Sequence, residues 1–363
     1  MMTAMEKNNK TLNVPNLRFP EFSGEWESIV LLDIYTFQYG EFNKNPDNGG
    51  EYPIYGANGV IGGYTRYNAE NSVVIGHMGA YAGTVLYEKG KHFVTYNGTI
   101  GTPKDNERLS TIFGYYMLTS LNIQKICAGS GLPFLSYDIL NKIKSHIPSF
   151  AEQQKIANFL SLIDQRIETQ KKVIEDLKKL KDAIREKLFR EVEKHCEVYD
   201  EIRNMLDYEQ PSEYLVSSTE YSDNYHTPVL TANKAFILGY TDEVHGIYDK
   251  GDCIIFDDFT MDLKYVTFPF KVKSSAIKIL TSKKDMDLYF MYEYLLFLDL
   301  VSEEHKRHYI SEIEPKSISC PPLQEQRRIA RTLRALDVKV ENAITHCDLL
   351  LKQKQSLLNQ LFI

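Results

Sequence analysis

Hydrophobic residues recur at helical spacing in two long and otherwise polar stretches of the chain. They step mainly by threes, fours or sevens, which is the spacing of a coiled-coil stripe. The predicted seam consists of Ile156, Leu160, Ile163, Ile167 and Leu177 in the first stretch, and of Ile329, Leu333, Leu336, Val340 and Leu350 in the second. We therefore expect two long helices that pack on each other rather than only on their own domains.

The two stretches are copies of each other. Residues 147–189 align without a gap with residues 320–362, at a constant offset of 173, and the identities include Pro148/Pro321, Glu152/Glu325, Gln153/Gln326 and Asp164/Asp337. Upstream, Gly63-Tyr64-Thr65 recurs as Gly239-Tyr240-Thr241, at nearly the same offset. These matches predict a tandem duplication of one unit, a globular module followed by a helix. An antiparallel helix pair would turn this direct repeat into an internal pseudo-two-fold, with the modules at opposite ends.

The segments between the helices, residues 21–146 and 197–319, are rich in Tyr, Val, Ile, Phe and Thr and are punctuated by Gly, Asn and Asp. This composition is typical of short β-strands joined by long loops. Residues 72–76 and 252–256 are expected to be buried strands, and residues 111–121 and 288–298 helices. The predicted fold class is α+β, with two mixed α/β domains separated by two long helices that form an antiparallel coiled coil.

Charge argues against a generic nucleic-acid-binding surface. The formal net charge is −7, and residues 196–319 alone hold 23 acidic against 12 basic side chains. DNA binding would therefore need local basic loops or a partner. The longest nearly apolar run, residues 289–301, is too short to span a membrane, and the N-terminus lacks the apolar stretch of a secretory signal. We expect a cytoplasmic protein that does not contact membranes.

Catalytic signatures are missing from the sequence. It contains no P-loop, H-E-x-x-H motif, nucleophile elbow or Rossmann fingerprint. Five scattered cysteines without a C-x-x-C pair suggest neither disulfides nor a zinc site. Asp257 and Asp258 could hold a metal, but adjacent acids at a strand end point to opposite faces, which favours a surface turn. We expect no catalytic residue, no bound metal and no cofactor in this chain.

The helix motif P-x-x-x-E-Q-x-x-I-A-x-x-L-x-x-x-D, present from Pro148 to Asp164 and again from Pro321 to Asp337, resembles the repeated helical region of the specificity (S) subunit of type I restriction-modification enzymes. The segments VPNLRFPEFSGEWE and YPIYGANGVIGGY resemble parts of that family's first target-recognition domain. Two features depart from the family pattern. Pro322 replaces the helix-capping Ser149 of the first copy, and the second module lacks the G-x-W of Gly24 to Trp26.

The resemblance implies a non-catalytic subunit that binds double-stranded DNA. Each module would read one half of a bipartite, asymmetric site, while the helices set the spacing and dock two methyltransferase (M) subunits. S-adenosylmethionine would belong to those subunits, and ATP and Mg to further restriction (R) subunits. The implied division is an N-terminal segment (1–20), a first recognition domain (21–147), a first helix (148–195), a second recognition domain (196–320) and a second helix (321–363).

Base reading requires side chains that donate or accept hydrogen bonds in the major groove, with aromatic or basic support. The predicted DNA-binding residues stand in glycine-flanked or polar segments: Tyr55, Asn58, Arg66, His77 and Tyr81 in the first module, and Asn233, Lys234, Lys264, Tyr265, Lys306 and Arg307 in the second. Three alternatives stay open at this point. They are the specificity subunit of a related type II system, a metal-dependent enzyme that uses Asp257 and Asp258, and a coiled-coil scaffold without a DNA role.

Overall fold

The structure is a computed structural model, which describes residues 13–42, 47–127, 133–231, 236–301 and 309–363. The chain divides into two compact units. Unit 1 contains residues 1–171 together with 345–363, and unit 2 contains residues 172–344. The long helices α4 (Phe150–His195) and α7 (Leu323–Leu361) each begin in one unit and end in the other.

Unit 1 is built on a six-stranded sheet with the strand order β2-β7-β5-β6-β3-β4. Its neighbours are antiparallel except for β3 and β6, which pair in parallel. The strands are β2 (Tyr35–Tyr39), β3 (Tyr52–Gly56), β4 (Gly59–Tyr64), β5 (Ala69–Gly76), β6 (Val85–Val94) and β7 (Gly98–Pro103). A two-stranded ribbon of β1 (Glu27–Val30) and β8 (Lys144–Ile147) leads into α4.

Short helices complete unit 1: α1 (Leu31–Ile34), η1 (Gly79–Tyr81), α2 (Thr111–Ser120), η2 (Ile123–Ile126) and α3 (Tyr137–Lys142). The expected strand at 72–76 is the second half of β5, and the expected helix at 111–121 is α2. Ser110 caps α2 by accepting a hydrogen bond from the backbone N–H of Phe113. Both predictions are confirmed: apolar composition marks the strand, and an apolar, aromatic run of helix length marks the helix.

Unit 2 repeats this architecture in a shorter form. Its sheets have the orders β10-β16-β13-β14 and β12-β11-β15, and β11 pairs with β15 in parallel, as β3 pairs with β6. The strands are β10 (Leu206–Glu209), β11 (Thr227–Leu230), β12 (Ile237–Thr241), β13 (Cys253–Asp257), β14 (Leu263–Val266), β15 (Lys271–Val272) and β16 (Ile277–Ser282). The single strand β6 of unit 1 thus corresponds to two short strands, β14 and β15. The duplication seen in the sequence is present in the strand order.

The remaining elements of unit 2 also have counterparts. The ribbon of β9 (Tyr199–Glu201) with β17 (Ser317–Ser319) corresponds to β1 with β8. The helices are α5 (Ile202–Met205), η3 (Pro211–Tyr214), α6 (Leu288–Phe297) and the π-helix η4 (Tyr309–Ile313). Helix α6 matches the predicted helix at 288–298 and is the counterpart of α2.

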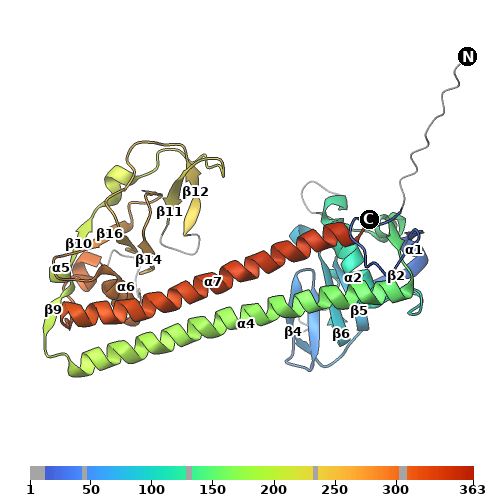
Figure 1. The fold of residues 1–363 in the computed structure, drawn as a ribbon, viewed down its shortest axis with the longest axis horizontal. Helices are drawn as coiled ribbons and strands as arrows, with labels where there is room; N and C mark the ends of the chain where they lie inside the picture. Colours follow the sequence, from blue (N-terminus) through green and yellow to red (C-terminus); the bar gives the residue numbers. More distant parts are fainter. Residues whose placement is uncertain (1–12, 43–46, 128–132, 232–235, 302–308) are drawn as a thin grey trace, which may run out of the picture. The chain divides into compact units, whose positions relative to one another are not determined.

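The long helices run antiparallel to each other. In unit 1 the start of α4 lies beside the end of α7, and Leu160 shares a buried core with Leu358 and Leu361 (Figure 1). In unit 2 the end of α4 lies beside the start of α7, and Phe189 shares a core with Leu333. The same apolar stripe also packs on the domain helices, as Leu160 does on α2. Each long helix therefore contacts its domain and its partner helix at once.

Candidate functional site

The turn between β3 and β4 and the loop after β5 bring two predicted DNA-binding residues into neighbouring positions. Asn58 is exposed in the turn between β3 and β4, and Tyr81 is 48% exposed at the end of η1. A Cβ atom at Gly76 would lie 2.1 Å from the carbonyl oxygen of Tyr81 and 3.1 Å from that of Ala57. Only glycine allows these two backbone segments to approach so closely. The turn and the loop therefore form one surface.

Tyr55 and His77 lie beneath this surface and are buried. The Tyr55 hydroxyl donates to the Glu88 carboxylate, and burial raises the pKa of Tyr55. The imidazole of His77 lies against Tyr39 and Phe134. Its Nδ1–H donates to the carbonyl oxygen of Leu135 at 2.9 Å, and burial lowers the pKa of His77. Both side chains support the loops, since neither presents its polar atoms to solvent.

Arg66 is exposed after β4, where its guanidinium pairs with Glu41 at 3.0 Å. Both side chains are largely solvated, so the ion pair is weak. Arg66 is thus the basic side chain that follows the hairpin of β3 and β4.

The second module distributes its predicted residues differently. Lys264 and Tyr265 lie on β14, and both are half-buried. The Tyr265 hydroxyl donates to Asp252 at 2.8 Å and accepts from Arg334 of α7, so Tyr265 links the sheet to the long helix. Burial raises the pKa of Tyr265. Asn233, Lys234, Lys306 and Arg307 lie outside the described residues.

The glutamine of the repeated motif attaches each long helix to its domain. In unit 1, Gln153 Oε1 accepts from the backbone N–H of Ser110, and its Nε2 donates to the carbonyl oxygen of Pro148. In unit 2, Gln326 makes the same two contacts with Asp287 and Pro321. The sequence identity of the glutamines was visible, but their partners were not, because those partners depend on the fold.

The glutamate of the motif differs between the units. The Glu152 carboxylate is buried and accepts two hydrogen bonds from Arg18, at 2.8 and 2.7 Å, and one from the indole of Trp26. Ser149 and Glu152 are spaced as a capping box, and Ser149 Oγ accepts from the Glu152 N–H, yet the Glu152 carboxylate binds Arg18 instead of completing the box. Its counterpart Glu325 is half-buried and bonds to Arg328, one turn further along α7.

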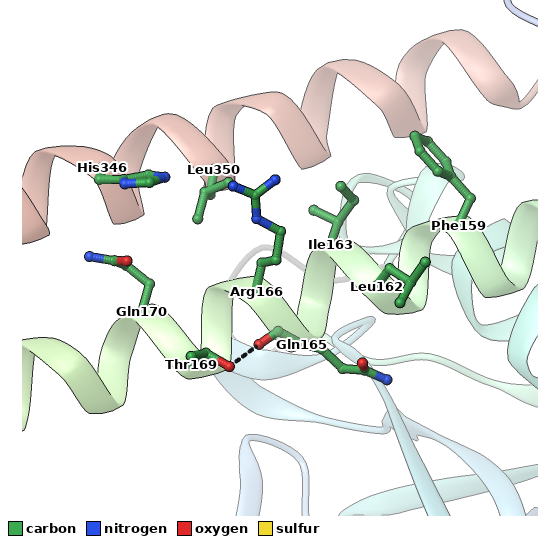
Figure 2. A pocket seen from close by; sticks show the side chains of 9 residues that line it. All are labelled: Phe159, Leu162, Ile163, Gln165, Arg166, Thr169, Gln170, His346 and Leu350. Carbon is green, nitrogen blue, oxygen red and sulfur yellow. Dashed lines mark hydrogen bonds between the residues drawn. The ribbon is translucent and has the colours of Figure 1, made fainter.

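Nine of the ten predicted seam residues are buried, and Leu177 is half-buried. Figure 2 shows a groove between α4 and α7 within unit 1, where Arg166 of α4 extends towards Leu350 of α7. The groove has a volume of about 620 Å³, and its lining includes Phe159, Leu162 and His346. Leu162 lines this groove and is 59% exposed.

A family model described as "Type I restriction modification DNA specificity domain" matches residues 23–179 and 203–346. The two matches together cover most of the chain, one for each copy of the repeat. The chain belongs to this family. Each matched region includes one of the two equivalent folds described above, together with the adjoining part of a long helix.

Curated type I specificity subunits are similar to this chain over lengths that differ from one relative to the next. The EcoR124I/EcoR124II specificity subunit of Escherichia coli is 51% identical over 120 residues, which are 31% of this chain and 30% of that protein. A putative type I specificity subunit of Mycoplasma genitalium is 27% identical over 46% of this chain and 45% of its own length. The chain therefore spans less than half the length of these two relatives. The putative MjaX specificity subunit of Methanocaldococcus jannaschii is 24% identical over 96% of this chain and 87% of that protein.

Solved structures share the fold. A type I restriction-modification S subunit from M. genitalium has a TM-score of 0.65 at 19% identity, covering 96% of this chain and 99% of that chain. A second structure, from work on complex assembly and conformational transition of the type I system, has a TM-score of 0.54 at 13% identity and covers 93% and 97%. These matches show the fold.

Asp257 and Asp258 have different partners in the specificity-domain fold. Asp257 accepts hydrogen bonds from the backbone N–H groups of Phe259 and Thr260, which makes it a turn residue. Asp258 is buried, accepts from the N–H of Tyr309 and lies 3.5 Å from the Lys278 ammonium group. Over the described ranges, no three His, Cys, Asp or Glu side chains cluster as metal ligands would. Within the same ranges, no helix combines the length and apolar character needed to cross a membrane.

Proposed function

We propose that this chain is the non-catalytic DNA sequence-specificity subunit of a type I restriction-modification complex. The observation that carries the proposal is the presence of two copies of one fold, each matched by the family model. Each copy would read one half of a bipartite, asymmetric DNA site. In this proposal the recognition domains are residues 21–147 and 196–320, and the helices are residues 148–195 and 321–363.

The first domain would contact bases through the surface formed by Asn58 and Tyr81, with Arg66 beside the hairpin. These side chains are exposed, and an amide, a phenol and a guanidinium are groups that read base edges or phosphates. Tyr55 and His77 would hold the loops in place. In the second domain we propose Lys264, together with the sequence-predicted Asn233, Lys234, Lys306 and Arg307. Tyr265 would act by holding β14 on α7.

The helix pair would dock two methyltransferase subunits. Large apolar side chains stay exposed on the helices outside the seam, among them Leu162, Val338 and Leu349. The groove beside Leu162 offers an apolar docking surface in unit 1. The docked subunits would bring S-adenosylmethionine, and restriction subunits would bring ATP and Mg, in the cytoplasm where the DNA is. Leu162→Glu should block assembly with the methyltransferase while leaving the melting temperature of the free chain unchanged.

Mapping of methylated adenines tests the proposed function directly. The chain and its cognate methyltransferase are expressed in a host without other adenine methylation, and the genome is sequenced for modified bases. We expect one split, asymmetric motif, and its loss when this chain is omitted. Methylation that does not depend on the chain would favour a scaffold, and metal-stimulated turnover by the isolated chain would favour an enzyme. Subunits that combine methylation with cleavage in one polypeptide would indicate a type II system.

A further inference from the structure

A tyrosine, an aspartate and a lysine from three different elements meet in each unit. In unit 1, Asp164 of α4 accepts a hydrogen bond from the Tyr116 hydroxyl of α2 at 2.8 Å, and the Lys354 ammonium group of α7 lies 2.6 Å from the same carboxylate. In unit 2, Asp337 of α7 accepts from Tyr289 of α6 and pairs with Lys181 of α4. Each of the three positions recurs at the offset of 173 that relates the two copies.

The arrangement ties the domain helix to both long helices. Tyr116 and Tyr289 are buried, and burial is the main cause that raises the pKa of each phenol, so each stays a neutral donor. The aspartate stands eleven residues after the motif glutamine, about three turns of helix, so both side chains lie on one face. The glutamine and the aspartate therefore hold the domain helix at two points. The lysine, which belongs to the other long helix, forms an ion pair with the aspartate and so connects the two long helices.

The two lysine–aspartate pairs are compatible with a single register of the two antiparallel helices. Seventeen residues separate Asp164 from Lys181 along α4, and seventeen separate Asp337 from Lys354 along α7. An antiparallel pair can therefore form both contacts without an insertion in either helix. A slip of one helical turn, about 5.4 Å, would break both pairs. Such a slip exceeds the rise of about 3.4 Å per base pair of B-DNA, which makes the register relevant to spacing.

We propose that Asp164 and Asp337 are positioning residues whose joints, Tyr116–Asp164–Lys354 and Tyr289–Asp337–Lys181, set the length of the unread DNA between the two half-sites. This inference rests on the proposed function and deepens it. The aspartates contact no base; they act by fixing each recognition domain on the helix pair. Loss of a joint should leave the half-site sequences unchanged and relax the spacing.

The test uses the full chain assembled with its methyltransferase and three DNA duplexes. The duplexes carry the same half-sites, separated by the wild-type spacer or by one base pair fewer or more. For Asp164→Asn and for Asp337→Asn we expect the preference for the wild-type spacer to fall about tenfold or more. Asp176→Asn and Asp348→Asn make the same chemical change at exposed positions of α4 and α7 and should keep the wild-type preference. Joint variants that keep it as well would overturn the proposal.

Thermal unfolding of the free chain provides a readout that does not depend on methylation. Asp164→Asn and Lys354→Met should each lower the melting temperature, and the double variant should lower it no further than the larger single change, because both remove one joint. Additive losses would overturn the joint itself. Should Asp164→Asn fail to fold, Tyr116→Phe removes a single hydroxyl and answers both questions. A wild-type complex that methylates no bipartite site would refute the proposed function. The unfolding experiment would still show whether Tyr116, Asp164 and Lys354 are energetically coupled.

Discussion

Arg18 and Glu152, 134 residues apart in the sequence, form a two-point ion pair in which the glutamate side chain is 2% exposed. The pair binds the N-terminal segment to the first turn of α4. Leu17 continues this attachment by donating its backbone N–H to the carbonyl oxygen of Gln360 near the end of α7. The segment around Arg18 therefore binds both long helices in unit 1, at the start of α4 and near the end of α7.

The first prediction compares this pair with its counterpart in the repeat. Glu152→Gln leaves the Arg18 guanidinium without its anion in a buried place, and should lower the free energy of unfolding of unit 1 by about 3 kcal/mol. Glu325→Gln is the matched control. It removes only a surface contact with Arg328 and should cost less than about 1 kcal/mol. Denaturant unfolding measures both; equal losses would contradict the difference in burial.

The second prediction concerns the seam. Leu160→Asp or Leu333→Asp places a carboxylate among fully buried apolar side chains and should cost about 3 kcal/mol or more. Leu162→Asp, two residues from Leu160 on an exposed face, should change stability by less than about 0.5 kcal/mol. Chemical denaturation followed by circular dichroism distinguishes the two. A loss below about 1 kcal/mol at Leu160 would count against the seam.

The third prediction uses a difference between the copies. In unit 2, buried Glu293 accepts from Arg185 at 2.7 Å and lies 2.7 Å from the Lys181 ammonium group. The equivalent positions in unit 1 are Ser120 and Leu358. Glu293→Ser alone leaves Arg185 without its buried anion and should lower the free energy of unfolding by about 3–5 kcal/mol. Glu293→Ser combined with Arg185→Leu introduces the residues that unit 1 has at these positions, and it should recover most of that loss. Hydrogen exchange of α6 measures the effect in unit 2; a double variant no better than the single would refute it.

The fourth prediction is a pH dependence of unit 1. Burial lowers the pKa of His77 and of His92 in the folded state, whereas the pKa of both is about 6.5 in the unfolded chain. As the pH falls below that value, the unfolded chain takes up protons first, so stability should decrease from pH 7 towards pH 5. His77→Asn retains a donor for Leu135 and cannot titrate, so its melting temperature should depend less on pH. Thermal unfolding of wild type and variant between pH 5 and pH 7 measures this; equal pH dependence of the two would contradict the prediction.

The long helices could be predicted because the sequence shows hydrophobic periodicity, and the duplication because two segments align at a constant offset. The types of these elements could be predicted as well, since α2 and α6 are apolar, aromatic runs of helix length. The site was harder. Tyr55 stands in a glycine-rich segment that favours a loop, yet it lies in β3, which pairs with β4 and β6. Its side chain is buried because it packs in a small core with Val74 and Val94.

Side-chain partners escaped prediction where they depend on tertiary packing. The sequence shows that Lys181 and Lys354 are equivalent, but it shows nothing of which residues oppose them. Only the antiparallel register brings Lys354 to Asp164. In the same way, Arg18 has no local signal for its partner, because Glu152 reaches it only after β8 leads the chain into α4.

The last prediction joins the repeat to the DNA site. Two unlike domains should read two unlike half-sites whose centres lie about one turn of DNA apart, roughly 10 base pairs. Replacing residues 21–146 with the first module of another family member should change one half-site and leave the other, since every element of the β2–β7 sheet lies within that segment. Methylation mapping of the chimera decides this.

Helix insertions distinguish the proposed spacing role of the long helices from the base recognition proposed for the two domains. A heptad added to one helix alone shifts one partner of the Lys–Asp pairs by two turns, about 10.5 Å, and should abolish activity. A heptad added to both helices, between Asp164 and Lys181 and between Asp337 and Lys354, preserves the register and both joints. We expect that variant to read the same half-sites with a longer gap. If both half-sites changed in the chimera, or if the target were continuous and palindromic, the two domains would not be independent readers joined by a ruler.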